Sequence, residues 1–214
     1  IVSSSMKMKD GPGEFMAAGS EEFSFLVNGR KVSGNDRWIV IDTKYLSDAH
    51  GGHGASVAAR NPELNISLTI NYILYQGLPL IKKNLIIENT SKADLNIESV
   101  DIESIKFGGD DGTHTWIMHE YGRQKALGPF VGECYDPVVV AHQFRNKRGI
   151  VLGNEAPGVM KLTTAFLKPQ QFTAGLTHAD QNYCFRKWIK PSGKWESTQV
   201  FTAVYENSSD PYEV

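Results

Sequence analysis

Long apolar runs are missing from this sequence. None approaches the roughly 20 residues that a membrane-spanning helix needs, so we expect no membrane span. A sustained i, i+3, i+4 apolar spacing is also missing. Because that spacing marks the buried face of an amphipathic helix, we expect helix to be a minor component.

An excess of basic residues is missing as well. The chain has 22 Lys and Arg against 24 Asp and Glu, which gives a formal net charge of −2. Binding to a nucleic-acid backbone requires clustered positive charge. The most basic stretch, residues 145–149, is better interpreted as a solvated turn. We therefore expect no nucleic-acid partner.

Cysteine is scarce, and common catalytic motifs are absent. Cys134 and Cys184 are too few for a disulfide scaffold or a CxxC-type zinc site. Cys184 lies in an apolar tripeptide and is expected to be buried, while a disulfide between the two cysteines stays open. No GxSxG, Walker, strand-linked GxGxxG or HExxH pattern occurs, and we expect no cofactor.

Period-two alternation dominates what is present. In residues 65–74, apolar side chains at 66, 68, 70, 72 and 74 alternate with polar ones, which predicts a strand with one buried face. A second strand follows, with Ile81, Leu85 and Ile87 on one face. A third spans residues 95–107, and its apolar phase shifts near Ser99 and Ser104, which indicates bulges.

Further strands are expected on both sides of these three. Residues 23–27 lead into Asn28-Gly29, a pair suited to a tight hairpin turn. Other candidates are residues 38–41, 138–144, 150–152, 159–168, 183–189 and 200–205. Many regularly spaced strands without helices predict an all-β fold, a large antiparallel two-sheet sandwich.

The domain prediction is one β-sandwich over residues 1–214, with residues 1–20 as an extended lead-in. The chain starts at Ile1 and ends in a polar, turn-rich stretch. We expect it to be a fragment of a longer protein or to have lost a leader. A secreted or periplasmic location is favoured over a cytoplasmic one.

The segment 114–123 holds the main candidate site. Its side chains include an aromatic plate for the apolar face of a sugar ring, and carboxylate, imidazole and guanidinium groups for hydroxyls. The predicted substrate-binding residues are Trp116, His119, Glu120, Tyr121 and Arg123. The alternative is a core Trp with partly exposed polar neighbours. No catalytic residue is predicted.

Three other patterns are weaker. His50 and His53 are a metal-ligand pair that lacks further ligands, and a mobile glycine-rich loop is the favoured interpretation. Asp110-Asp111-Gly112 lacks the ligand ladder of a calcium loop and is favoured as a turn. Trp188 and Trp195 flank a turn, and we expect them to be buried in the sandwich rather than exposed as a contact surface.

One longer pattern carries a resemblance. Residues 75–91 (YQGLPLIKKNLIIENTS) place an aromatic residue and a proline before a strand that ends in N-x-S, and residues 95–98 begin the next strand. Residues 188–197 (WIKPSGKWES) place a PxG turn before the last strand. Over about residues 20–210, this order resembles the N-terminal β-supersandwich domain of melibiase-type α-galactosidases and related glycoside hydrolases, in the galactose-mutarotase-like superfamily.

The resemblance implies a non-catalytic, carbohydrate-associated domain that packs on a catalytic (β/α)8 barrel outside this chain. Two alternatives remain. One is a mutarotase-like epimerase that uses His119 with Glu120 or Glu133, although the NHxYFNL-type motif of the mutarotases is missing. The other is a free-standing carbohydrate-binding protein.

Overall fold

The computed structural model describes residues 1–8, 11, 13–108, 113–118, 131–135, 137–166 and 170–211, with only the backbone for residues 116–118. All strand pairings in this part of the chain are antiparallel, and they form two sheets. The predicted all-β two-sheet sandwich is confirmed. None of the described helices is long and apolar enough to span a membrane.

The seven-stranded sheet has the order β2-β1-β7-β13-β12-β9, and β14 pairs with residues 95–98 at the start of β7. Its strands are β1 (Glu22–Val27), β2 (Arg30–Ser33), β7 (Leu95–Lys106), β9 (Gly132–Cys134), β12 (Lys161–Phe166), β13 (Gln171–Leu176) and β14 (Arg186–Ile189).

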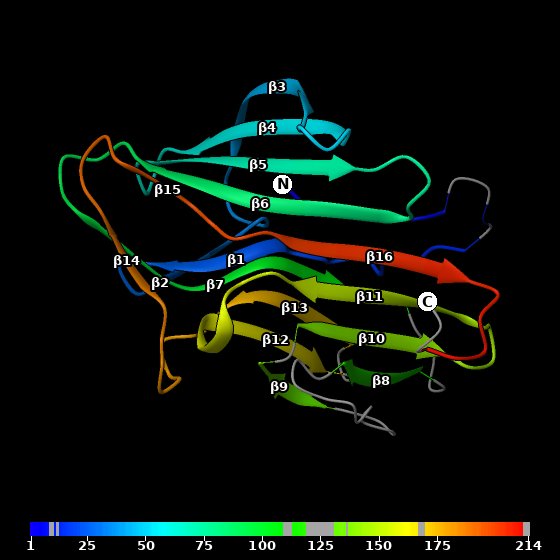
Figure 1. Ribbon diagram of the computed structural model, residues 1–214. Coiled ribbons are helices and arrows are strands. Elements are labelled where there is room, and N and C mark those ends of the chain that lie inside the picture. Colours follow the sequence, from blue (N-terminus) through cyan, green and yellow to red (C-terminus); the bar gives the residue numbers. More distant parts are fainter. Residues whose placement is uncertain are drawn as a thin grey trace.

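The nine-stranded sheet has the order β3-β4-β5-β6-β16-β11-β10-β8, and β15 pairs with β6. Figure 1 shows it from β3 at the top of the view to β8 near the bottom. Its strands are β3 (Ile39–Ser47), β4 (His53–Asn61), β5 (Ile66–Leu74), β6 (Leu80–Asn89), β8 (Thr113–Met118), β10 (Val138–Gln143), β11 (Arg148–Asn154), β15 (Lys194–Glu196) and β16 (Val200–Glu206). A single 3-10 turn, η1 (Gly158–Met160), is the one helical element in the described ranges.

The core lies between the sheets, where each strand contributes one face. Ile66, Leu68 and Ile70 of β5 are buried, as the alternation predicted, whereas Leu74 reaches the open end of the sandwich and is exposed. From the seven-stranded sheet, Phe23, Phe25 and Phe172 are among the largest buried side chains. The polar residues between these positions face away from the core.

Both predicted irregularities in β7 are present. The register of β7 with β1 shifts twice, and Ser99 has a φ of 51°, in the left-handed region. The second shift follows Asp101, and in this bulge both Ile102 and Glu103 are buried inside the sandwich. The predicted Asn28-Gly29 hairpin is also confirmed, because both residues have positive φ and join β1 to β2.

Two sequence-based expectations are wrong. Cys184 is exposed rather than buried, and no disulfide joins it to Cys134. Trp188 is 58% exposed, because it lies on the outward side of β14. The strand predicted for residues 38–41 is present as the start of β3, which begins at Ile39 and is an exposed edge strand.

A buried ionic cluster joins the two sheets. Lys83 of β6 donates hydrogen bonds to Glu103 Oε1 of β7 at 2.9 Å and to the Glu22 carbonyl of β1 at 2.6 Å. Its Nζ also lies 2.7 Å from Glu22 Oε1. Tyr72 donates to the same carboxylate oxygen of Glu22 at 2.6 Å, and Thr202 donates to Glu103 at 3.0 Å. Lys83 is therefore shared by two carboxylates, and each carboxylate also accepts a hydrogen bond from a hydroxyl group.

The two carboxylates of this cluster have opposite pKa shifts. Burial by itself would raise the pKa of Glu22, but the charge and hydrogen bond of Lys83 lower it below the usual value. Burial raises the pKa of Glu103, and Lys83 offsets this only in part. Burial would lower the pKa of Lys83, but the charges of Glu103 and Glu22 raise it. Lys83 is thus held in its charged form.

Replacing Lys83 tests the energetic role of the cluster. Lys83→Met leaves two buried carboxylates without their cation, which should lower the free energy of unfolding by about 3–5 kcal/mol in urea denaturation. Adding Glu103→Gln should recover part of this loss. Lys187→Met, at an exposed residue of β14, is the control and should change stability by less than about 0.5 kcal/mol. Equal stability of Lys83→Met and Lys187→Met would contradict this role.

Candidate functional site

The predicted sugar-contact residues lie mostly outside the described residues, namely His119, Glu120, Tyr121 and Arg123. The same holds for Asp110 and Asp111. The backbone of Trp116 lies in β8, opposite Val140 of β10. The structure therefore places the start of the predicted segment at one edge of the nine-stranded sheet.

A buried histidine lies on the strand beside β8. His142 of β10 pairs with His114 of β8, and its Nδ1 is 2.7 Å from the Tyr205 hydroxyl. Its Nε2 has no hydrogen-bond partner among the described residues. Burial lowers the pKa of His142 below its usual value, which favours the neutral ring. This histidine is a further polar group next to the predicted segment.

The histidine pair His50 and His53 does not form part of a larger ligand set. His53 Nδ1 is hydrogen bonded to the Tyr45 hydroxyl, and the two rings stack at 5.9 Å. The backbone N–H of His50 donates to Asp48 at 2.9 Å, so the loop is fixed by a carboxylate. Within the described ranges, no three His, Cys, Asp or Glu residues are grouped as metal ligands.

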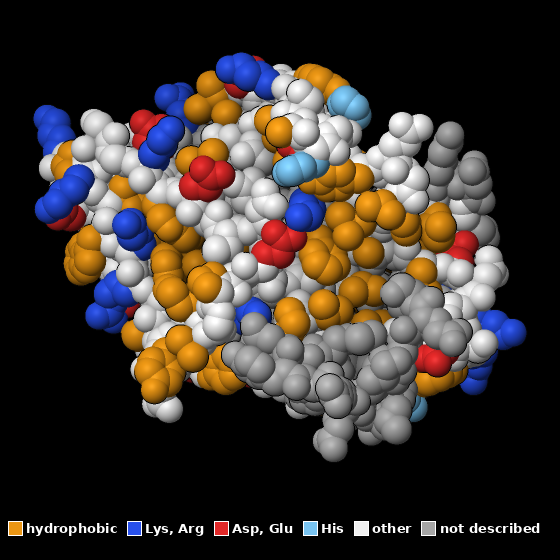
Figure 2. Space-filling model, in the orientation of Figure 1, with side chains coloured by type: hydrophobic (Ala, Val, Ile, Leu, Met, Phe, Trp, Pro, Cys, Tyr) orange, Lys and Arg blue, Asp and Glu red, His pale blue; other side chains and the backbone are white. Residues whose placement is uncertain are grey.

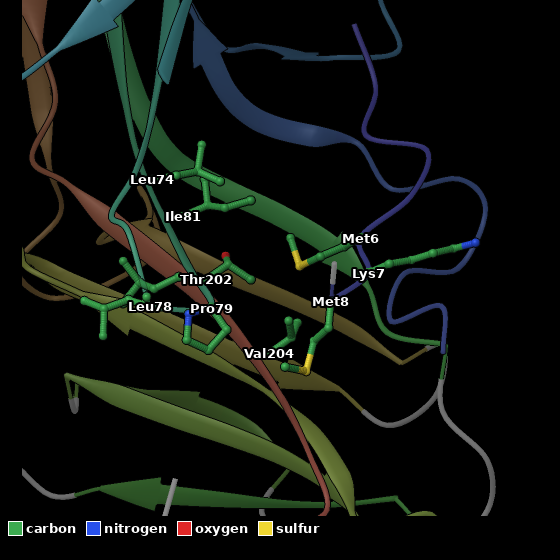
Figure 3. A pocket seen from close by; sticks show the side chains of 11 residues that line it. Met6, Lys7, Met8, Leu74, Leu78, Pro79, Ile81, Thr202 and Val204 are labelled. Carbon is green, nitrogen blue, oxygen red and sulfur yellow. The ribbon is translucent and has the colours of Figure 1, made fainter. Parts of the chain in front are cut away.

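A cleft of about 540 Å³ opens at one end of the sandwich. Figure 3 shows Met6 and Met8 on one side of it and Leu78 and Pro79 on the other. Figure 2 shows hydrophobic side chains gathered on this face near the ends of β5, β6 and β16. Because the lining is mainly apolar, with Lys7 and Thr202 as exceptions, the cleft is poorly suited to a polyhydroxylated ligand.

The outward face of the seven-stranded sheet has the opposite character, and we call it the polar face. It arises from alternation along each strand. In β1, Phe23 and Phe25 point into the core and Ser24 points away. In β13, Thr173 points away between Phe172 and Ala174. A row of such residues crosses four strands in register. The row is Glu133 of β9, Thr164 of β12, Thr173 of β13 and Ser104 of β7.

His178 lies at the middle of the polar face, directly after β13. Its Nε2 is 3.0 Å from Asp101 Oδ1, and the Ser24 hydroxyl donates to Asp101 Oδ2 at 2.7 Å. Burial by itself would lower the pKa of His178, but the hydrogen bond and charge of Asp101, helped by Asp180 and Glu133, raise it above the usual value. A proton donor and carboxylates thus converge here.

A second group lies at the β9 end of the polar face. Gln181 donates to Glu133 Oε2 at 2.8 Å and accepts a hydrogen bond from the Tyr135 hydroxyl at 2.7 Å. Thr164 and Thr173 share a hydrogen bond of 2.8 Å. Tyr135 is 49% exposed, so its ring is open to solvent beside hydrogen-bonding groups.

The third group lies at the β14 end. Arg186 donates to Glu98 Oε1 of β7 at 2.5 Å, and Trp188 lies two residues further along the same side of β14. Trp195, in contrast, packs against Phe185 with ring centroids 5.0 Å apart and against the core. An exposed aromatic ring beside a guanidinium and carboxylates is a combination that binds sugars.

Sequence reasoning missed most residues of the polar face. Sequence reasoning named Glu133 but not His178, Asp101, Ser24 and Arg186, because these residues come from segments that are far apart in the chain. The available signal was the polar half of the alternation in β1, β7 and β13. That signal marks an outward face without saying which strands are neighbours.

Solved structures with a similar fold include α-galactosidases. The chain matches the galactosidase domain of α-galactosidase-sucrose kinase AgaSK with a TM-score of 0.66 and 11% identity, over 87% of this chain and 30% of that one. It matches the GH36 α-galactosidase AgaB from Geobacillus stearothermophilus with a TM-score of 0.61 and 14% identity, over 92% of this chain and 32% of that one. The match to the α-galactosidase from Lactobacillus brevis has a TM-score of 0.57 and 11% identity, over 96% of this chain and 33% of that one.

The predicted resemblance is confirmed for the fold. This chain spans about a third of the length of those α-galactosidases, consistent with a sandwich domain of the larger enzymes. No family model matches the chain, and no curated protein matches it. At identities this low the likeness extends to architecture only.

The pairing of His178 with Asp101 can be measured by NMR titration. In Asp101→Asn the carboxylate charge is lost while burial remains, so the pKa of His178 should fall toward or below its usual 6.5. The raised pKa of His178 stabilises the folded state below pH 6.5, and this contribution is lost as the pH rises through the pKa of the folded state. The stability of the variant should therefore lose that pH dependence. Asp180→Asn should lower the pKa less. An unchanged pKa in Asp101→Asn would refute the pairing.

Proposed function

We propose that this chain is a non-catalytic, carbohydrate-associated β-sandwich domain of a glycoside hydrolase, which supports a catalytic (β/α)8 barrel outside the chain. The observation that carries the proposal is the fold match, which covers about nine-tenths of this chain and a third of several α-galactosidases. The polar face adds the residue types that contact sugars.

A hydrolysis assay tests the non-catalytic part of the proposal. The chain alone should release no p-nitrophenol from p-nitrophenyl α-galactoside above the buffer rate, because the catalytic carboxylates are expected on the barrel. A Glu133→Gln variant is the matched control for contaminating activity. Saturable turnover that disappears in Glu133→Gln would contradict the proposal.

The carbohydrate-associated part is proposed for two surfaces. One is the sequence-predicted segment with Trp116, His119, Glu120, Tyr121 and Arg123. The other is the polar face, where Trp188 offers an exposed ring and Arg186 and His178 offer donors. Sugar recognition by stacking plus hydrogen bonds needs both kinds of group within one surface.

A glycan array with two Trp variants separates these surfaces. Trp188→Ala should weaken binding about tenfold, or 1.4 kcal/mol, with unchanged thermal stability, since the ring is mostly exposed. Trp116→Ala should weaken binding without unfolding if the segment 114–123 contributes. Unchanged affinity of either variant removes its surface from the proposal.

A mutarotase-like epimerase is the second candidate. The observation that favours it is the convergence of His178, Asp101 and Glu133, since a histidine and a carboxylate can transfer protons at a sugar ring oxygen and an anomeric hydroxyl. NMR of a freshly dissolved pure anomer should then show faster exchange with added protein, and His178→Gln should abolish the acceleration. An exchange rate equal to that in buffer rejects this candidate.

A further inference from the structure

The edge strand β3 is the most exposed strand of the structure. Every residue of Ile39–Ser47 is exposed or half-buried, and Val40, Ile41 and Tyr45 are 55%, 59% and 72% exposed. In Figure 1, β3 lies at the top of the view, at the end of the nine-stranded sheet. Among the described strands only β4 pairs with it, so its outer edge presents free N–H and C=O groups.

An exposed edge with apolar side chains favours pairing with another strand. The charges of β3 indicate which strand. Asp42 and Lys44 lie two positions apart on the same side and form an exposed ion pair at 2.9 Å. When two copies of such a strand pair antiparallel about the residue between the two charges, the negative charge of each copy lies opposite the positive charge of the other.

The geometry of antiparallel pairing restricts the possible registers. Two opposite residues both direct their N–H and C=O groups toward the other strand, or both direct them away from it. These two kinds of residue alternate along each strand. A strand paired with its own copy must therefore have the two-fold axis at a residue rather than between residues. Only a few registers remain for the regular part of β3.

Charge selects among these registers. An axis at Asp42 places two carboxylates opposite each other, and an axis at Lys44 places two ammonium groups opposite each other, which is destabilising. An axis at Thr43 places Asp42 opposite Lys44 of the second copy, twice by symmetry.

We propose that β3 pairs antiparallel with β3 of a second copy of this chain, with the two-fold axis at Thr43. The bulge of β3 against β4, between Val40 and Asp42, limits the regular pairing to a short central segment. Each copy has one β3, and the pairing occupies the outer edge of β3 in both copies. No third copy can pair at this edge, so the assembly closes at two chains. This inference is independent of the carbohydrate function.

Charge exchange tests the register. By sedimentation velocity the chain should approach about 47 kDa, twice its 23.7 kDa, as its concentration rises. Asp42→Lys and Lys44→Asp should each remain monomeric, because like charges then lie opposite. The double variant Asp42→Lys/Lys44→Asp should dimerise again. Lys190→Glu, in an exposed ion pair with Asp94, is the control and should leave the mass unchanged.

Disulfide trapping tests the axis directly. In a Cys184→Ser background, Thr43→Cys should give a covalent dimer on oxidation, since residues at the axis face each other. Ser47→Cys should not, because its two copies would be roughly 25 Å apart. A monomer at all concentrations, or a dimer that neither single charge variant disrupts, would overturn the proposal.

Discussion

Burial of one apolar face from each sheet is the constraint on which the rest of this structure depends. Since side chains alternate along a strand, filling the space between the sheets leaves an equal number of side chains outside. On β1, β7 and β13 these include Ser24, Asp101 and Thr173, which belong to the polar face with its linked hydrogen bonds and have little exposed area. The core and the candidate site are thus two consequences of one alternation.

The alternation is broken where charge enters the core. The second bulge of β7 buries Glu103 beside Ile102, and Lys83 occupies an inward position between apolar neighbours on β6. Each group would be costly inside the sandwich without the other. The left-handed backbone of Glu22, with a φ of 70°, completes this arrangement by bringing a second carboxylate to Lys83.

Much of the fold could be predicted from sequence, because the large apolar residues of β5, β6 and β7 alternate clearly. The bulges of β7 were also visible as phase shifts. The strands β4 and β13 were missed, since their segments are rich in Ala, Gly and Ser or Thr and have weak apolar contrast. The pattern placed Ile81, Leu85 and Ile87 on one face of a strand, but Lys83 was not singled out, because its ionic partners lie on distant strands.

The candidate site was harder to predict, since it depends on which strands are neighbours. Asp101 and His178 are 77 positions apart and meet only because β13 pairs with β7. The exposure of Trp188 also depended on pairing, because β14 pairs with the start of β7 and its tryptophan is turned to solvent. Residue types in a local window carry no information of this kind.

The place of β16 in the nine-stranded sheet has a consequence for biosynthesis. This late strand lies between β6 and β11 in the sheet. In the sequence, β6 precedes it by more than a hundred positions and β11 precedes it by about fifty. Until it leaves the ribosome, β6 and β11 each present an unpaired, partly apolar edge. Such distant pairings slow folding, and the nine-stranded sheet cannot be completed before residues 200–206 have been synthesised.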